Sequence, residues 1–377
     1  AVDALTVEIK LSRPAPVLLI LLSNTPMLFP APKHLIEKVG DGWTKPGVMV
    51  SSGPFTLAAW RPGDRVRVVK NPRFYDAKTV ALDEVNFYPT VDDSAALNRY
   101  RAGELDLNPR FPPNQLGWLQ KNLSGEVFVT PALWVTYLIP NHTKAPFNDA
   151  RVRKALSIAI DRPTLTDKVL RNGEKPYGGV VPDTIPGYVT PRPFDARPRE
   201  QRIAEAKALL AQAGFGPQKP LKFLFNHRAG LNNRLAAVAI TQMWKDIGVQ
   251  AEILQSDVTV HYNKLRANDF VFADAGWAAN PDPEFFLHIL LKESESNYGR
   301  YDNPKMEAQA TAASALADPA ARLKAYAAAE AMAFDDTALI PLFISAERLI
   351  VKPYVKGWTQ NPLGQYPSRY IRIEGRK

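Results

Sequence analysis

Residues 146–162 constrain the fold most, because they define both the start of a helix and its apolar face. Asn148 or Asp149 can cap this helix, since a short side-chain oxygen accepts hydrogen bonds from the free N–H groups of a first helical turn. Apolar residues recur at spacings of three and four, at Val152, Ala155, Leu156, Ala159 and Ile160. The spacing predicts an amphipathic helix, of a kind common in globular proteins, with Arg151, Arg153, Lys154 and Ser157 on its other side.

The length and composition favour a folded protein with more than one lobe. A chain of 377 residues exceeds the size that one hydrophobic core usually serves. Its net charge of +9 comes from Lys and Arg scattered along the sequence, which indicates a dispersed charged surface and no nucleic-acid partner. There are no cysteines, which excludes disulfides, thiol catalysis and cysteine-bound metals. No apolar run reaches the roughly 18 residues that a membrane span needs.

The chain changes character near residue 133. Residues 1–133 are rich in strand signals, at residues 5–11, 65–69, 84–88 and 126–130. Residues 134–346 alternate strands and helices: strands at 221–226, 249–255 and 270–273 are separated by helices at 232–246 and 258–265. A helix at 202–213 ends at Gly214, a residue suited to a left-handed cap. The alternation predicts a parallel sheet with right-handed crossovers.

The order of residues is more specific than their spacing. The run PFNDARVRKALSIAIDR at 146–162 closely resembles the signature segment of the extracytoplasmic solute-binding proteins, family 5, the oligopeptide- and dipeptide-binding proteins of ABC transporters. Residues 205–215 also closely resemble the family, and weaker matches occur in the right order at residues 52–57, 71–75 and 102–106. The resemblance implies an α/β fold of the two-lobed periplasmic binding protein type (type II, Venus-flytrap) with mixed sheets.

The same resemblance implies the domain boundaries. Residues 1–133 form lobe I, residues 134–346 form the α/β ligand-binding lobe II, and residues 347–377 return to lobe I. The chain then crosses between lobes twice, with candidate hinges at 131–137 and 344–349. Family members normally carry well over a hundred residues before the equivalent of Ala1, so lobe I is expected to be incomplete, with another chain as one source of the missing part.

The implied function is that of the substrate-binding component of an ABC importer. Such a protein captures a short peptide or peptide-like solute between its lobes in the periplasm and delivers it to a membrane permease. It is not an enzyme and needs no cofactor. Two alternatives remain: a truncated module that docks a partner or senses a ligand, and a binder of a non-peptide solute such as a sugar derivative, an opine or a chelated metal.

The candidate ligand segment is the predicted loop at residues 274–283, because ligands bind beyond the carboxyl ends of strands in doubly wound sheets. Trp277 offers a flat apolar wall with one donor, and Asn280 and Asp282 offer acceptors. In peptide-binding relatives an Asp after the Gly-Trp pair holds the ligand's α-ammonium. Asn280 stands nearest to that position here, and Asp282 is the substitute if the loop turns inward. A Pro-stiffened turn with a packed Trp is the structural alternative.

Further candidates come from comparison with the family. Val258 stands where peptide binders often have Trp, and Asp274 stands where the closest oligopeptide binders have an Arg that meets a ligand carboxylate. Trp134 and Tyr137 face the ligand at the first hinge by analogy, with core packing as the alternative, and Asn233 lies at the start of a helix. No catalytic or metal site is expected, because the five histidines show no zinc-binding spacing and no Gly-x-Ser-x-Gly motif is present.

Overall fold

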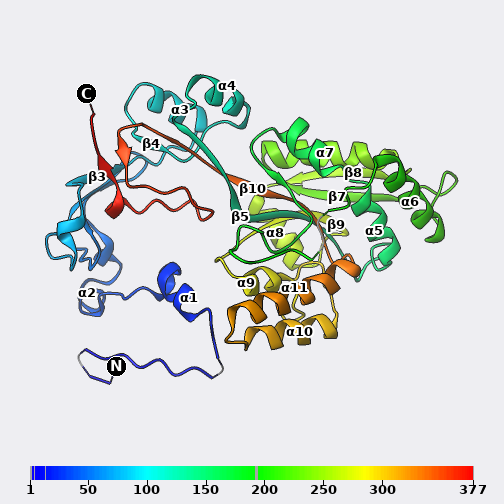
Figure 1. The fold of residues 1–377 in the computed structure, drawn as a ribbon, viewed down its shortest axis with the longest axis horizontal. Coiled ribbons are helices and arrows are strands. Elements are labelled where there is room, and N and C mark those ends of the chain that lie inside the picture. The colour runs from blue at the N-terminus through cyan, green and yellow to red at the C-terminus, as the bar shows by residue number, and fades with distance from the viewer. Residues whose placement is uncertain (1, 4, 13, 192–193, 377) are drawn as a thin grey trace. The chain divides into compact units, whose positions relative to one another are not determined.

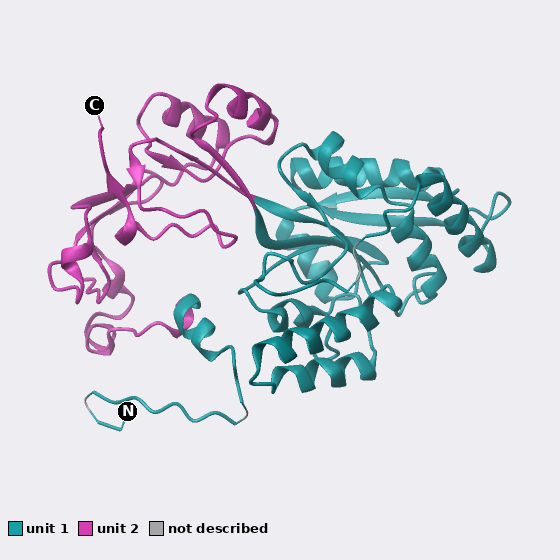
Figure 2. Cartoon of the chain, viewed as in Figure 1, with its two compact units in different colours: residues 1–25, 131–346 teal, residues 26–130, 347–377 magenta. Residues whose placement is uncertain are grey.

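The computed structural model describes residues 2–3, 5–12, 14–191 and 194–376. The chain divides into two compact units: unit 1 comprises residues 1–25 and 131–346, and unit 2 comprises residues 26–130 and 347–377 (Figure 2). The chain passes from one unit to the other inside two long strands, β5 (Val127–Pro140) and β10 (Ile340–Val351). Both predicted hinge ranges lie in these strands. Residues 1–25 group with unit 1, whereas the predicted lobe I includes them, and the lobe boundaries and hinges stay predictions.

One mixed sheet organises unit 1 (Figure 1). Its hydrogen-bonded order in the described chain is β4-β10-β5-β9-β7-β8, with β6 also paired to β10. The remaining bounds are β4 (Leu107–Asn108), β6 (Lys175–Pro176), β7 (Lys222–Arg228), β8 (Gln250–Ser256) and β9 (Phe272–Ala278). β7 pairs in parallel with β8 and with β9, whereas β5 runs antiparallel to β9. The predicted parallel series of strands is therefore confirmed.

The helices of unit 1 follow the predicted apolar stripes closely. Their bounds are α1 (Leu18–Asn24), α5 (Ala150–Ile158), α6 (Arg199–Gln212), α7 (Leu231–Lys245), α8 (Val258–Arg266), α9 (Pro283–Leu287), α10 (Pro304–Ser314) and α11 (Pro319–Asp335), with a π-helical turn at Thr164–Leu170. Gly214 has φ +85°, as its predicted role in the cap after α6 requires. α7 packs along β7 and β8, and α10 packs on α11 (Figure 1). In the described chain no helix combines the length and the apolar character that a membrane span requires.

The core of unit 1 lies between α5, α7 and the sheet. Phe147, Phe225, Phe272 and Trp244 are buried and in ring contact, and the Trp244 indole N–H donates to the Leu156 carbonyl at 3.0 Å. The predicted stripe of α5 faces this core, since all five of its members are buried. Complementary packing of this kind supplies most of a helix's stability in a protein.

The position of Arg153 corrects the prediction that it lies on the solvent side of α5. Its side chain is buried, and its guanidinium donates to the carbonyls of Thr337 at 3.0 Å and Phe147 at 2.9 Å. Thr337 follows the C-terminal end of α11, where carbonyl groups lack helical partners and attract a cation. Helical spacing cannot reveal such a partner, because it lies more than 180 residues away along the chain.

β9 extends five residues further than predicted. Residues 274–278, expected to belong to a loop, continue the strand because β5 pairs with them from Leu138↔Asp274 to Trp134↔Ala278. The loop begins at Ala279. The small and polar residues of this segment do not look like strand residues in isolation, and the partner strand supplies the hydrogen bonds that hold them extended.

Unit 2 contains a small antiparallel sheet, β1 (Phe55–Arg61), β2 (Arg65–Lys70) and β3 (Glu84–Phe87), and a ladder of β11 (Val355–Lys356) with β12 (Arg372–Ile373). Its helices are α2 (Lys33–Val39), α3 (Asp93–Arg101) and α4 (Leu116–Asn122). In unit 1, the strand predicted at residues 5–11 is wrong: these residues are exposed and irregular. Alternating residues form a strand only when a neighbouring strand takes up their backbone hydrogen bonds, and the described chain provides none there.

A buried carboxylate on α11 holds the loop around residues 177–190. Glu330 is fully buried and accepts hydrogen bonds from the backbone N–H groups of Val180 at 2.7 Å and Val181 at 2.9 Å, and from the Tyr188 hydroxyl. Burial raises the pKa of Glu330 to about 7 from its ordinary value of 4.5, although these three hydrogen bonds act in the opposite direction.

The raised pKa of Glu330 predicts an unusual pH dependence of stability. Between pH 4.5 and about 7 the folded chain keeps a proton that the unfolded chain releases, so the free energy of unfolding falls as pH rises through this window. In Glu330→Gln we expect the decrease in unfolding free energy across this pH window to be smaller by about 2–3 kcal/mol, because an amide does not titrate. Urea unfolding at pH 4.5, 6 and 8 measures the effect, with exposed Glu293→Gln as the control. An unchanged pH dependence in Glu330→Gln would contradict the assignment.

Candidate functional site

The carboxyl ends of three neighbouring parallel strands meet at one edge of the sheet in unit 1. β7 ends at Arg228, β8 at Ser256 and β9 at Ala278. β5 runs the other way and brings Trp134 opposite Ala278 at the same edge. Open α/β sheets bind ligands beyond this edge, because the loops and helix N-termini that follow the strands converge there.

A buried ion pair joins the end of β7 to the middle of β9. The Asp274 carboxylate accepts from the Arg228 side chain at Nε, 3.0 Å away, and from the Arg228 backbone N–H at 2.9 Å. Both side chains are more than nine-tenths buried. Burial alone would lower the pKa of Arg228, but the Asp274 carboxylate and nearby tyrosines outweigh it and raise the pKa. The Arg228 guanidinium therefore stays protonated, with the Asp274 carboxylate as its partner.

His261 and Tyr262 of α8 complete the surroundings of this ion pair. The His261 ring nitrogen Nε2 lies 2.8 Å from the Asp274 carbonyl oxygen, and burial lowers the pKa of the ring, so it acts as a neutral donor. The Tyr262 hydroxyl accepts from Arg228 Nη1 at 3.3 Å and lies 3.4 Å from the Gly276 nitrogen. The His261 ring is buried against these residues.

The pairing of β5 with β9 divides the predicted site residues between two faces of the sheet. Paired residues share a face and successive residues alternate, so Tyr137 and Trp277 lie on one face, and Trp134 and Asp274 on the other. The Trp134 indole is 42% exposed and passes directly over Gly276. Tyr137 is buried, which corresponds to the core-packing alternative considered for it.

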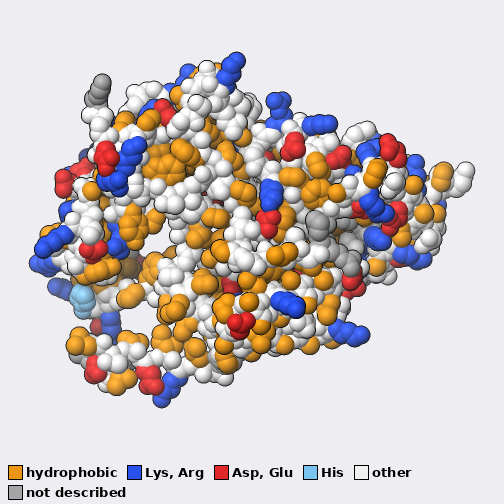
Figure 3. All heavy atoms as spheres, viewed as in Figure 1, with side chains coloured by type: hydrophobic (Ala, Val, Ile, Leu, Met, Phe, Trp, Pro, Cys, Tyr) orange, Lys and Arg blue, Asp and Glu red, His pale blue; other side chains and the backbone are white. Residues whose placement is uncertain are grey.

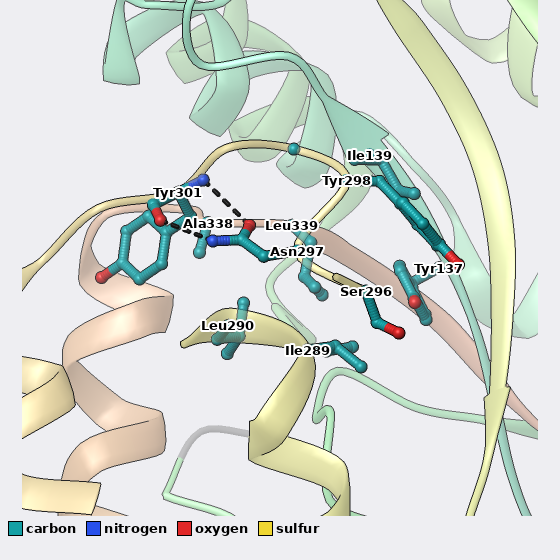
Figure 4. Close-up of a pocket in the computed structure, with 11 residues that line it drawn as sticks. Tyr137, Ile139, Ile289, Leu290, Ser296, Asn297, Tyr298, Tyr301, Ala338 and Leu339 are labelled. Carbon is teal, nitrogen blue, oxygen red and sulfur yellow. Dashed lines mark hydrogen bonds between the residues drawn. The ribbon is translucent and has the colours of Figure 1, made fainter. Parts of the chain in front are cut away.

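Tyr137 lines a small cavity on its face of the sheet. Figure 4 shows its side chain beside those of Tyr298, Ser296 and Ile289. The Asn297 amide fixes the loop that carries these residues, since it donates to the Tyr301 carbonyl at 2.8 Å and accepts from the Tyr301 N–H at 3.0 Å. Burial, followed by the charge of neighbouring Tyr262, raises the pKa of the Tyr137 hydroxyl, which therefore stays protonated.

Trp277 and the loop after β9 are held by contacts within unit 1. The Trp277 indole N–H donates to the Phe285 carbonyl at 2.7 Å, and Asn280 accepts from the Asn24 amide at 2.5 Å. Asp282 caps α9 through the Glu284 N–H at 2.9 Å and forms a buried ion pair with Arg322. Both oxygens of Asp282 thus have protein partners. Its role as a ligand acceptor, like those of Trp277 and Asn280, stays a prediction.

The remaining predicted residues lie in helical turns that follow strands. Val258 begins α8 directly after β8 and is 47% exposed, so its side chain is accessible at the strand ends. Asn233 lies in the first turn of α7 and donates to the Ala229 carbonyl at 3.1 Å. Both residues lie at the carboxyl edge of the sheet, and their contact with a ligand stays a prediction.

Sequence reasoning missed three residues of this site, Arg228, Tyr262 and Tyr298. Arg228 comes two residues after the end of the strand predicted at 221–226 and so lies outside it. A signal was present, because a buried Asp274 in an apolar strand requires a cationic partner, and Arg228 ends the strand before α7. Tyr262 follows His261 on the predicted helix, and Tyr298 belongs to a stretch without regular periodicity.

Fold and site together define a class of protein. The mixed sheet carries a polar and aromatic candidate site at the carboxyl ends of its parallel strands, and two strands pass between the units. This is the arrangement of a periplasmic solute-binding protein. Solved structures support the class. The unliganded open form of the murein tripeptide-binding protein MppA matches with a TM-score of 0.82 at 33% identity, over 97% of this chain and 71% of that chain. The predicted two-lobed periplasmic-binding-protein fold is confirmed.

The sequence comparisons identify the family. The model of the bacterial extracellular solute-binding proteins, family 5, matches residues 1–298, and the chain belongs to this family. The periplasmic murein peptide-binding protein MppA of Escherichia coli (strain K12) is 34% identical over 364 residues, 96% of this chain and 67% of the relative. The probable deoxycholate-binding periplasmic protein YgiS of the same organism is 34% identical over 380 residues, 99% of this chain and 70% of the relative.

A peptide-bound structure is also similar. The crystal structure of Haemophilus influenzae OppA in complex with RPPGFSPFR matches with a TM-score of 0.78 at 31% identity, over 96% of this chain and 72% of that chain. The similarity therefore extends over both units of the chain, including β5, β7 and β9, which carry the candidate site.

Gly276 lets the Trp134 indole pass close to the backbone of β9. A Cβ at this position would lie 2.4 Å from Trp134 Nε1 and 3.0 Å from Arg228 Nη1. We expect Gly276→Ala to displace both side chains, lower the unfolding free energy by about 1–3 kcal/mol and weaken ligand binding at least about tenfold. Calorimetric titration and urea unfolding measure the two effects.

The control for Gly276→Ala is Gly117→Ala. Gly117 lies in α4 with open space around its missing Cβ. Alanine there should leave ligand affinity unchanged and stabilise the helix by up to about 1 kcal/mol. Equal effects of the two substitutions on affinity would contradict a steric role for Gly276.

The Asp282–Arg322 pair predicts a large effect on stability. Removal of Asp282 leaves the buried Arg322 guanidinium without one of its two carboxylate partners and removes the cap of α9. We expect Asp282→Ala to lower the unfolding free energy by about 3–5 kcal/mol. Asp302→Ala, which removes the exposed partner of Lys292, should cost less than about 1 kcal/mol. Similar costs for the two variants in urea unfolding would contradict the structural role of Asp282.

Proposed function

We propose that this chain is the substrate-binding component of an ABC importer and captures a short peptide or peptide-like solute in the periplasm. It delivers the solute to a membrane permease and performs no chemical reaction on it. The observation that carries the proposal is the similarity, over nearly the whole chain, to periplasmic proteins named for binding peptides. Closure of two lobes over the ligand, with residues 134–346 as the ligand-binding lobe, is part of the proposal.

The chemistry of the sheet edge supports a solute with both polar and apolar parts. The exposed Trp134 indole offers a flat apolar surface, and Tyr262 and the ends of β7 and β9 offer hydrogen-bonding groups. Peptides present a repeated pattern of donors, acceptors and side chains that suits such a surface. The surface charge is compatible with a small ligand. On the face shown in Figure 3, Lys and Arg are scattered and interspersed with Asp and Glu.

A non-peptide solute is the second candidate. YgiS, a relative of equal identity, is named as a probable binder of deoxycholate, an amphipathic carboxylate. In this chain Asn280 is the residue nearest to the Asp of the family's peptide binders, and an amide brings no full charge for an α-ammonium. A solute without an α-ammonium would not need that charge.

Identification of the ligand that accompanies the purified protein tests the proposal. The full chain is purified gently, denatured to release bound molecules, and the released fraction is analysed by mass spectrometry. We expect short peptides, and titration of the stripped protein with recovered peptides should give saturable 1:1 binding. Recovery of only bile acids, sugars, opines or chelated metal, together with no binding of any peptide, would overturn the peptide assignment.

A further inference from the structure

A buried carboxylate at the sheet edge lies outside every contact described so far. Glu174 precedes β6 and is 9% exposed. Its Oε1 atom accepts from the Asn172 amide at 2.9 Å and from the Asn232 amide at 3.1 Å. Asn232 lies in the first turn of α7, four residues after the end of β7 at Arg228. The Glu174 loop therefore reaches the same edge of the sheet as the candidate site.

Two oxygens of this cluster lack hydrogen-bond partners. Glu174 Oε2 and Asn232 Oδ1 are buried, and no donor in the described part of the chain reaches either atom. Exchanging Oδ1 and Nδ2 of the Asn232 amide would not supply the missing donor, because Oδ1 would then face the acceptor Glu174 Oε1. An unpaired buried acceptor costs about 1–3 kcal/mol, and more when it is charged. The cluster therefore presents acceptors only and lacks a donor.

The charges of the surrounding residues make the missing donor a cation. Arg228 and Asp274 compensate each other, and burial keeps His261 neutral. Among the described residues, no Lys, Arg or His forms an ion pair with Glu174. A buried carboxylate without a cation is rare, because removal of its charge from water is costly. Asn232 itself is only partly buried, and its amide contacts Glu174.

We propose that Glu174 and Asn232 form a specificity subsite for a basic group of the ligand, a primary ammonium or a guanidinium. The cation donates to Glu174 Oε2 and Asn232 Oδ1, and the Asn232 side chain shifts to admit it. This inference rests on the proposed function, because it names the class of peptide, one with a Lys or Arg side chain, that the site prefers. The subsite should make the protein prefer ligands with a basic side chain. Asp274 would not give this preference, because Arg228 already pairs with its carboxylate.

Paired ligands that differ by one charge test the subsite. Tripeptides that carry Lys are compared with the same tripeptides carrying norleucine, by calorimetric titration of the full stripped chain. We expect the wild type to bind the Lys peptides about 10–100-fold more tightly, the range of a charge-assisted hydrogen bond. Glu174→Gln keeps the shape and the two amide contacts, and should abolish this preference without weakening the norleucine peptides.

Two further variants keep the result interpretable. Glu252→Gln removes a similar carboxylate from the exposed surface of β8 and should leave the preference unchanged. Asn232→Ala removes Asn232 Oδ1, one of the two unpaired acceptors, and should reduce the preference. It provides the decisive result if Glu174→Gln does not fold.

The outcomes separate the inference from the function on which it rests. Three results would each overturn the subsite and leave a bridging water as the partner of these oxygens. They are a wild type that binds both peptide series equally, a Glu174→Gln variant that keeps the Lys preference, and an Asn232→Ala variant that keeps the full preference. Failure of the wild type to bind any peptide would overturn the proposed function, and the subsite with it.

Discussion

The antiparallel pairing of β5 with β9 is the interaction on which the site depends. Seven residue pairs, from Trp134↔Ala278 to Pro140↔Phe272, join strands that are far apart in sequence. Asn141 continues the contact past the end of β5, since its N–H donates to the Val271 carbonyl and its amide to the Phe270 carbonyl, both at 3.0 Å. This pairing holds residues 274–278 extended, sets Trp134 over Gly276 and decides which side chains share a face.

Compensation of buried charge is the second constraint on unit 1. Arg228 pairs with Asp274 within β9, and Arg322 pairs with Asp282 beyond the end of β9, whereas the buried Arg153 is held by backbone carbonyls. Such pairs add little net stability compared with apolar residues, but the loss of one partner is costly, which fixes the arrangement of the strand ends. Glu330 is held by backbone N–H groups and a tyrosine hydroxyl, whereas Glu174 lacks a donor for one oxygen.

Local signals in the sequence predicted much of the fold. The spacing of Val152, Ala155 and Leu156 identified α5 and its buried face, and alternating elements at 221–273 identified the parallel strands. These features depend on residues close together in the chain. The extension of β9, the burial of Arg153 and the irregular conformation of residues 5–11 depend on partners elsewhere, or on their absence from the described chain, and spacing does not contain that information.

The sequence predicted that the candidate site lies at this edge of the sheet, but not all of the side chains that are found there. Sequence reasoning found the edge of the sheet through the strand that leads to Trp277, and the family resemblance added Trp134, Tyr137 and Val258. It did not find Arg228, because the partner of a buried charge is set by the register between β7 and β9. Amide hydrogen exchange, measured on the stripped and the ligand-loaded chain, tests most directly whether this edge binds the solute. Slower exchange on loading is expected at residues 228–233 and 274–280, with the turn between β1 and β2 unchanged. Protection confined to other segments, with both ranges unaffected, would contradict the assignment of the site.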